Sequence, residues 1–501
     1  MLRGARTLST ACSVARRASL ARNLRKFPLQ AKPHIPSTRS LASAAQAQAP
    51  THTPTPESSQ SPVRTQDLPI VSNDAKQVAV GWDTRTWSKF HNIWLRDHCR
   101  CPKCFHAITK QRLLNTFEIP RDIAPLTVAA KPDGLEVTWN TSDAHISLYP
   151  WSWLRFNSYD PPSSSFAPSP SITDDGKPEK VLWGAKIQQS PPTVTYEQVM
   201  EEGDAGLYKW LENVDKFGFS FVTGVPPTPE ATEELSERIG FIRETQYGKF
   251  WDFTSDLAKG DTAYTTLALG AHTDNTYFTD PCGLQLFHLL SHTGGTGGST
   301  LLVDGFYVAS LLKSLHPEAY HLLSTVPVPA HAAGEPSALY QPSPVRGYPV
   351  LGHVGGSSFS SGTGGSSTFG GESGKEGEGE LVQVRWNNDD RSVMSHLEPA
   401  VVEKWYDAIR LWNKALTSPD SQYWVQLTPG TAVVVDNHRV LHGRSAFTGK
   451  RRMCGAYIGV DEYRSKLAVL RERFASDPVL EATKDIPESV VAGRSVWHTA
   501  L

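Results

Sequence analysis

The chain has 501 residues, more than one compact domain usually holds, and 39% hydrophobic and 10% aromatic residues are enough to form buried cores. These values exclude a wholly disordered protein. No apolar run approaches the roughly 18 residues that a membrane-spanning helix needs. The net charge of −2 gives no electrostatic reason to expect a nucleic-acid-binding protein.

The N-terminal segment is strongly basic. Nine Arg and Lys residues and no acidic residue precede Glu57. Segments rich in Arg, Ser and Ala and free of acids are typical of mitochondrial transit peptides. We therefore expect a transit peptide and a disordered Pro- and Gln-rich spacer over residues 1–67, and a location in the mitochondrial matrix. A basic disordered tail that binds anionic surfaces is the alternative.

A small β-rich domain is predicted next, over residues 70–159. Gly134–Trp139 alternates apolar and polar residues directly after a Pro-Asp-Gly turn, which is typical of a strand. The following residues, 160–193, are rich in Pro and Ser, with little periodicity. We interpret them as a linker or surface insertion.

The main domain is predicted over residues 194–490, where apolar strand patterns alternate with helical ones. Residues 398–416 carry the clearest helical spacing, and their aromatic side chains are expected to belong to the core. The pattern predicts a mostly β domain with flanking helices, an α+β class. Residues 355–380 are dominated by Gly and Ser, so we expect a disordered loop inserted in this domain. The predicted strands are 219–223, 284–290, 299–303, 431–435 and 453–458.

Three of the six cysteines lie within six residues, at Cys99, Cys101 and Cys104. Clustered thiolates suit Zn²⁺, which takes four ligands in a tetrahedron. Disulfides between such close neighbours are geometrically poor. His145, after the strand that ends at Trp139, is the best candidate for the fourth ligand. The cluster predicts a closed structural zinc site, with free thiols as the alternative.

A His and a carboxylate two residues apart are half of the facial triad that holds Fe(II) in oxygenases. The spacing occurs three times, but residues 316–318 and 396–398 each open a helical pattern, where first-turn chemistry explains them. His272 and Asp274 follow the strand-like residues 263–269, and side chains two apart on extended backbone point the same way. This pair is the best candidate for an iron site.

The second His should come from a distant strand. His438 and His442 both lie just beyond the apolar run 431–435, and the residues alone leave the choice between them open. Arg451 and Arg452 enter the next strand pattern. A buried guanidinium there could bind a dicarboxylate cosubstrate through two hydrogen bonds, which a Lys could not replace.

Several motifs in one order resemble the γ-butyrobetaine and trimethyllysine dioxygenases of carnitine biosynthesis. The motifs are Trp94–Cys104, His272–Asp274, Gly297–Gly305, Arg385–Asp389 and Asp436–Arg444. The likeness covers about residues 78–470. Segments that look more like the trimethyllysine branch are Arg243–Trp251, Phe253–Asp256, Gly260–Thr265 and Phe447–Gly455. His438, where Trp is usual in the family, and the insertions at 355–380 and after Pro161 depart from the pattern.

The resemblance implies roles for particular residues. It assigns Fe(II) to His272, Asp274 and His442, 2-oxoglutarate to Arg451 with help from Thr300, and zinc to Cys99, Cys101, Cys104 and His145. It further implies a double-stranded β-helix (jelly-roll) catalytic domain behind the small zinc-binding domain, a homodimer, and ascorbate as a further cofactor.

The implied reaction is hydroxylation of N6,N6,N6-trimethyl-L-lysine at C3 by O₂, the first step of carnitine biosynthesis. By resemblance, the aromatic faces that hold the trimethylammonium group through cation–π contacts come from Tyr247, Trp251, Tyr264 and Tyr457. Ordinary core aromatics are the alternative reading of these four residues. The alternative activities are γ-butyrobetaine dioxygenation, non-catalytic binding of methylated lysine, and metal-dependent hydrolysis.

Overall fold

The computed structural model describes residues 69–162, 180–254, 265–332, 347–354 and 379–474. The predicted transit peptide and spacer (1–67) lie outside these ranges, as do Tyr264 and nearly all of the predicted Gly/Ser loop. Glu380, the last residue of that loop, begins a strand. No helix in the described ranges has the length and apolarity to cross a membrane.

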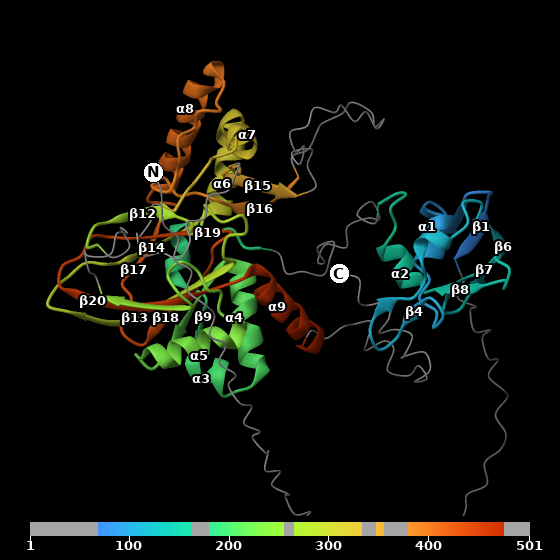
Figure 1. Cartoon of the computed structure of the whole chain (residues 1–501), viewed down its shortest axis with the longest axis horizontal. Coiled ribbons are helices and arrows are strands. Elements are labelled where there is room, and N and C mark those ends of the chain that lie inside the picture. Colours follow the sequence, from blue (N-terminus) through green and yellow to red (C-terminus); the bar gives the residue numbers. More distant parts are fainter. Residues whose placement is uncertain (1–68, 163–179, 255–264, 333–346, 355–378, 475–501) are drawn as a thin grey trace, which may run out of the picture. The chain divides into compact units, whose positions relative to one another are not determined.

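The N-terminal part contains two three-stranded antiparallel sheets and a short hairpin (Figure 1). Its strands are β1 (Ile70–Asn73), β2 (Gln77–Gly81), β3 (Trp87–His91), β4 (Phe105–His106), β5 (Gln111–Arg112), β6 (Pro125–Lys131), β7 (Gly134–Trp139) and β8 (Ile146–Tyr149). Its helices are α1 (Asn92–Asp97), the 3₁₀ helix η1 (Thr116–Glu118) and α2 (Trp151–Phe156). The predicted strand at 134–139 is confirmed as β7. The inward residues of β7, including Leu135 and Trp139, are fully buried in a core of their own.

The C-terminal part is built on two sheets. The larger has the order β11-β20-β13-β18-β10-β9, antiparallel except for the β9–β10 pair. Its strands are β9 (Thr193–Thr195), β10 (Phe219–Thr223), β11 (Phe250–Thr254), β13 (Leu284–Thr293), β18 (Thr431–Asp436) and β20 (Lys450–Ile458). The smaller has the antiparallel order β12-β19-β14-β17. Its strands are β12 (Leu269–His272), β14 (Thr300–Asp304), β17 (Tyr423–Val425) and β19 (Val440–Arg444). A separate hairpin pairs β15 (Leu351–Val354) with β16 (Glu380–Val384).

Seven α-helices within the described ranges flank these sheets (Figure 1). They are α3 (Tyr196–Met200), α4 (Asp204–Phe217), α5 (Pro229–Ile239), α6 (Gly305–Leu315), α7 (Pro317–Thr325), α8 (Pro399–Leu416) and α9 (Val460–Phe474). The helix predicted over 398–416 is α8; its side chains Trp405 and Trp412 are fully buried, as a core role requires. The prediction of a mostly β chain with flanking helices is confirmed.

Alternation along the strands explains the layers. On β18, Val433 and Val435 point into a core shared with Leu302 of β14, between the two sheets. Ala432 and Val434 point the other way, into a core with α4, α5 and α9. The neighbours of Leu302 on β14 likewise pack against α6, α7 and α8. Both sheets are therefore buried on both faces, which fits their continuous apolar runs.

The second half of the predicted linker is more ordered than its composition suggests. Residues 185–189 form a 3₁₀ helix, η3 (Ala185–Gln189), and Trp183 is buried in the core between the sheets. The indole of Trp183 donates to the Phe217 carbonyl over 2.6 Å, and its backbone N–H donates to Asp304 over 3.1 Å. One large side chain and its hydrogen bonds thus hold a segment without periodicity against the core between the sheets.

A buried ion pair fixes the start of α6 against β19. Asp304, the N-cap of α6, accepts from Arg439 over 2.7 and 3.1 Å, and both side chains are almost fully buried. Arg439 also donates to the backbone carbonyls of Lys216 and Val181. Because all these groups are satisfied, the chain that leads into β19 is held in one position.

A buried histidine on β13 predicts a pH dependence of stability. Burial lowers the pKa of His288 to about 4, and its Nδ1 lies 2.8 Å from the Thr232 hydroxyl. The unfolded pKa is about 6.5, so protons bind the unfolded chain preferentially between these values. The stability that His288 contributes above pH ~6.5 is therefore lost as the pH falls toward 4.

We expect His288→Gln to flatten this dependence by up to about 1.4 kcal/mol per pH unit, measured by urea unfolding of parent and variant between pH 4 and 7. His292→Gln, on the same strand but only half-buried, is the matched control. Parallel stability curves for the parent and His288→Gln would contradict the expectation.

Candidate metal centres and active site

Three potential metal ligands meet at the edge of the smaller sheet. His272 ends β12 and pairs in register with His442 of β19. Their rings lie 4.5 Å apart, and Asp274 Oδ1 is 3.2 Å from His272 Nε2 and 3.7 Å from His442 Nε2. The structure thus brings together the three residues expected to bind iron. His438 lies elsewhere, with its Nε2 3.4 Å from the Pro281 carbonyl.

The local backbone differs from the expectation in one respect. Of the strand expected over 263–269, residues 263 and 264 lie outside the described ranges and 265–268 are not in a strand. The observed strand begins at Leu269 and ends on His272 itself. Asp274 lies beyond the strand, and Asn275 follows it with a φ of 59°, in the left-handed region that Asn tolerates. The carboxylate is therefore turned toward the two imidazoles by a bend as well as by strand alternation.

The electrostatics of the three groups suit a divalent cation. Burial and the nearby His272 lower the pKa of His442 to about 3, so its imidazole is neutral at physiological pH. Burial alone would lower the pKa of His272, but the Asp274 carboxylate raises it to about 8. Burial would raise the pKa of Asp274, yet the histidines hold it below its ordinary value. A carboxylate and two imidazoles on one side are the donor set that Fe(II) oxygenases use.

Two amide side chains that sequence reasoning missed support Asp274. Asn437 accepts from the Asp274 backbone N–H over 2.8 Å and donates to its carbonyl over 2.9 Å. Gln285 Nε2 donates to Asp274 Oδ2 over 2.7 Å. The motif at 436–444 contains Asn437 and could have indicated its role. Gln285 lies in an ordinary apolar strand, where the sequence gives no sign of a role at the site.

The metal-ligand cluster opens into a cavity of about 850 Å³. Among its lining residues are all three ligands, Arg451 and Thr300, and the aromatic residues Tyr247, Trp251, Tyr277 and Tyr457. The structure therefore places every expected iron, cosubstrate and substrate residue in the described ranges on one cavity. The cavity is large enough for a cosubstrate and an amino-acid substrate together.

Arg451 is the group in this cavity best suited to bind an anion. Its side chain is buried, and its Nε has no hydrogen-bond partner in the described part of the chain. Burial, with the nearby Arg444, lowers the pKa of Arg451 to about 10, so the guanidinium remains charged. Gly298 lies against this side chain: a Cβ added to Gly298 would be only 3.2 Å from Nε of Arg451. A buried charge with an unused donor predicts a carboxylate ligand.

The structure describes three of the four aromatic residues that are predicted to form a cage around the trimethylammonium group. Trp251 and Tyr457 lie with ring centroids 6.5 Å apart, and the Tyr247 hydroxyl is 3.4 Å from that of Tyr277, which was not predicted. Tyr264 lies outside the described residues. Trp251 and Tyr457 also belong to the core between the sheets, so they are core residues whose faces reach the cavity.

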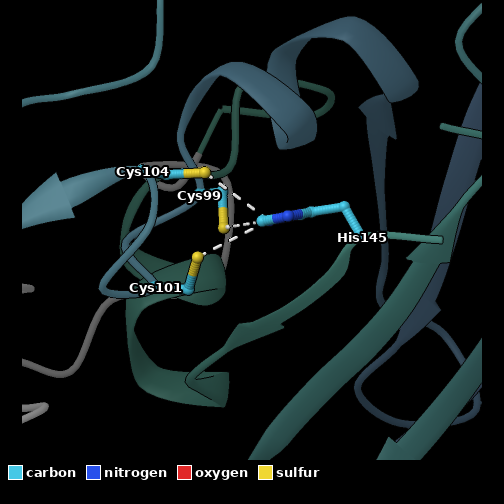
Figure 2. A group of neighbouring side chains, drawn as sticks. All are labelled: Cys99, Cys101, Cys104 and His145. Atoms are coloured by element: carbon cyan, nitrogen blue, oxygen red, sulfur yellow. Dashed lines mark hydrogen bonds between the residues drawn. The ribbon is translucent and has the colours of Figure 1, made fainter. Parts of the chain in front are cut away.

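The four predicted zinc ligands converge in the N-terminal part. Figure 2 shows three thiol sulfur atoms turned toward Nε2 of His145, at 3.4 Å for Cys99 and 3.5 Å for Cys101 and Cys104. Sulfur and nitrogen ligands of one tetrahedral zinc ion lie roughly 3.5 Å apart, since the Zn–S and Zn–N bonds are about 2.3 and 2.0 Å. Arg96 donates to the Cys104 sulfur over 3.3 Å, which supports a thiolate. The group has the separation that a shared zinc ion requires.

Comparison with known proteins agrees with this geometry. The sequence model of the taurine catabolism dioxygenase TauD, TfdA family matches residues 175–457, and that of the gamma-butyrobetaine hydroxylase-like N-terminal domain matches residues 70–155. The trimethyllysine dioxygenase of Meyerozyma guilliermondii is 43% identical over 82% of this chain and 97% of its own length. The mitochondrial trimethyllysine dioxygenase of Homo sapiens is 40% identical over 75% of this chain and 82% of its own.

A γ-butyrobetaine dioxygenase is a weaker match. That of a Pseudomonas species is 31% identical over 81% of this chain and 96% of its own length. The resemblance seen in the sequence motifs is therefore confirmed over most of the chain. The chain belongs to the TauD/TfdA dioxygenase family and, within it, to the trimethyllysine dioxygenases.

Proposed function

We propose that this dioxygenase hydroxylates N6,N6,N6-trimethyl-L-lysine at C3, with Fe(II) on His272, Asp274 and His442 and 2-oxoglutarate as cosubstrate. The observation that carries the proposal is that these ligands share one cavity with several aromatic faces and with the buried guanidinium of Arg451, whose Nε has no hydrogen-bond partner among the described residues. When bound, iron and 2-oxoglutarate supply the O₂-dependent hydroxylation of an unactivated C–H bond, with release of succinate and CO₂.

The chain's own residues bind and orient the metal, the cosubstrate and the substrate. His272, Asp274 and His442 would hold the metal, and all three line the cavity. Arg451, assisted by Thr300, would bind the distal carboxylate of the cosubstrate. The aromatic faces of Tyr247, Trp251 and Tyr457 hold the trimethylammonium group, which has no N–H to donate, and exclude water from its surroundings. We add Tyr264 to this cage on the family resemblance alone.

The proposal extends to the organisation of the protein. Residues 70–159 form a zinc-binding domain held by Cys99, Cys101, Cys104 and His145. Residues 194–490 form a jelly-roll catalytic domain, and the predicted linker 160–193 joins the two domains, with its second half packed on the catalytic domain. Ascorbate maintains the iron centre, two copies form a homodimer, and the enzyme resides in the mitochondrial matrix. The basic first segment supports the location, as do vertebrate relatives named mitochondrial.

Substrate choice is tested directly. Purified protein with Fe(II), 2-oxoglutarate and ascorbate should convert trimethyllysine to its 3-hydroxy product with kcat/KM at least about tenfold higher than for γ-butyrobetaine. Product is measured by mass spectrometry, and succinate release is measured in parallel. Faster turnover of γ-butyrobetaine would instead favour the second candidate, which the weaker relative supports. Binding of trimethyllysine without succinate release would favour a non-catalytic binding protein.

Zinc is expected to stabilise the N-terminal part without entering the chemistry. Cys104→Ser should reduce the zinc content from about one ion per chain to nearly none and lower the thermal midpoint of this part, because a closed zinc site contributes directly to folding. Zinc is measured by plasma mass spectrometry and unfolding by calorimetry. Cys282→Ala, which removes a buried thiol outside the cluster, is the control and should keep its zinc. Full zinc content in Cys104→Ser would contradict the assignment.

A further inference from the structure

The two carboxylate oxygens of Asp274 have different surroundings. Oδ1 faces the imidazoles, 3.2 Å from His272 Nε2 and 3.7 Å from His442 Nε2. Oδ2 accepts two hydrogen bonds from the opposite side, from the Tyr457 hydroxyl over 2.8 Å and from Gln285 Nε2 over 2.7 Å. The carboxylate is therefore divided between a metal-facing oxygen and an oxygen that is already saturated with donors.

The donors and the imidazoles come from different sheets. Gln285 of β13 and Tyr457 of β20 are direct register partners on the larger sheet, as His272 and His442 are on the smaller one. Gln285 and Tyr457 are only 2% and 5% exposed, so water does not compete freely for their hydrogen bonds. Asp274 thus connects a pair of residues on one sheet to a pair on the other.

This arrangement has a consequence for metal binding. A carboxylate can bind a metal through one oxygen or through both, and the second mode would occupy a position needed by a cosubstrate or O₂. Both hydrogen bonds to Oδ2 must be broken before that oxygen can turn to the metal, and each is made to a charged group, which strengthens it. The geometry therefore favours binding through Oδ1 alone.

Tyr457 has a second role in the same cavity. Its ring lies beside Trp251, among the aromatic faces assigned to the trimethylammonium group, while its hydroxyl points to Asp274. Resting on the proposed function, we propose that Tyr457 and Gln285 are positioning residues, which hold Asp274 in a one-oxygen binding mode and link the substrate cage to the metal centre.

The test uses a variant that keeps the ring and removes the hydroxyl. Tyr457→Phe should bind Mn(II), as a stand-in for Fe(II), about 10- to 100-fold more weakly than the parent, as loss of outer-sphere hydrogen bonds commonly does. Affinity is measured on iron-free, zinc-replete protein by the loss of the free Mn(II) signal in electron paramagnetic resonance. In iron-saturated protein, kcat should fall while KM for trimethyllysine changes by less than about threefold, because the ring remains.

Tyr247→Phe is the matched control. It removes a hydroxyl from the same cavity that lies 3.4 Å from the Tyr277 hydroxyl, so Mn(II) affinity should stay within about twofold of the parent. Gln285→Met removes the second donor to Asp274 with little change in side-chain volume. It provides the same test if Tyr457→Phe does not fold. Because both donors hold one oxygen, the double variant should lose less affinity than the two single losses multiplied together.

The outcomes separate the inference from the proposed function. Equal Mn(II) affinity in the parent, Tyr457→Phe and Gln285→Met overturns the inference alone. A raised KM for trimethyllysine with unchanged metal affinity also overturns it, since the hydroxyl would then serve the substrate. If the parent binds no Mn(II), or if His272→Ala binds it as well as the parent does, both the proposed function and the inference are wrong.

Discussion

Replacing His272 with alanine is expected to lower kcat for trimethyllysine by more than about 100-fold, because loss of a metal ligand should exceed the 10- to 100-fold cost of losing an outer-sphere partner. The imidazole lies 3.2 Å from Asp274 at the end of β12 and belongs to none of the hydrophobic cores, so its loss removes a donor without leaving a cavity in them. Zinc content and the thermal midpoint should stay near those of the parent. Turnover and bound iron are measured on the same preparation.

His438→Asn is the informative control for this experiment. His438 was the competing candidate in the sequence, but its Nε2 is near the Pro281 carbonyl rather than the cluster. Its replacement should leave kcat within about threefold of the parent, since it removes no interaction with the reacting groups. Retained activity in His272→Ala, or loss of iron in His438→Asn, would show that the metal is held elsewhere.

Arg451→Lys is expected to raise KM for 2-oxoglutarate about 100-fold with a smaller effect on KM for trimethyllysine. A guanidinium can form two parallel hydrogen bonds to a carboxylate, whereas an ammonium is a point charge that cannot reproduce that geometry. Loss of one charged hydrogen bond and of this orientation costs about 1.5–3 kcal/mol. Steady-state kinetics with 2-oxoglutarate varied at saturating trimethyllysine measures the effect.

The neighbouring arginine provides the control. Arg452 sits on the same strand, points to the surface and pairs with Asp252 of β11. Arg452→Lys should therefore leave both KM values within about twofold of the parent, because exposed ion pairs contribute little. An unchanged KM for 2-oxoglutarate in Arg451→Lys would mean that the cosubstrate carboxylate binds elsewhere in the cavity.

Local features of the site could be predicted from local sequence. A zinc cluster was expected because Cys99, Cys101 and Cys104 are close in the chain and thiolates are the ligands that zinc prefers. The pairing of His272 with Asp274 was predicted from the alternation of side chains on an extended segment, although the strand ends at His272 and a bend completes the arrangement. The strands and α8 were found because their apolar periodicity is strong enough to compete with other influences. The packed half of the linker was missed because Trp183 is a single anchor without a period.

Features that depend on distant partners were decided only by the tertiary structure. The residues alone left His438 and His442 equivalent; the family resemblance chose His442, and the register of β19 against β12 then placed it opposite His272. The same holds for Gln285, which resembles any polar residue in an apolar strand until β13 pairs with β20. The sequence by itself determined which chemical groups this protein carries and which of them lie near one another along the chain. Strand pairing determined which groups share a ligand, because contacts between residues more than a hundred positions apart have no local signature and arise only when the sheets pack.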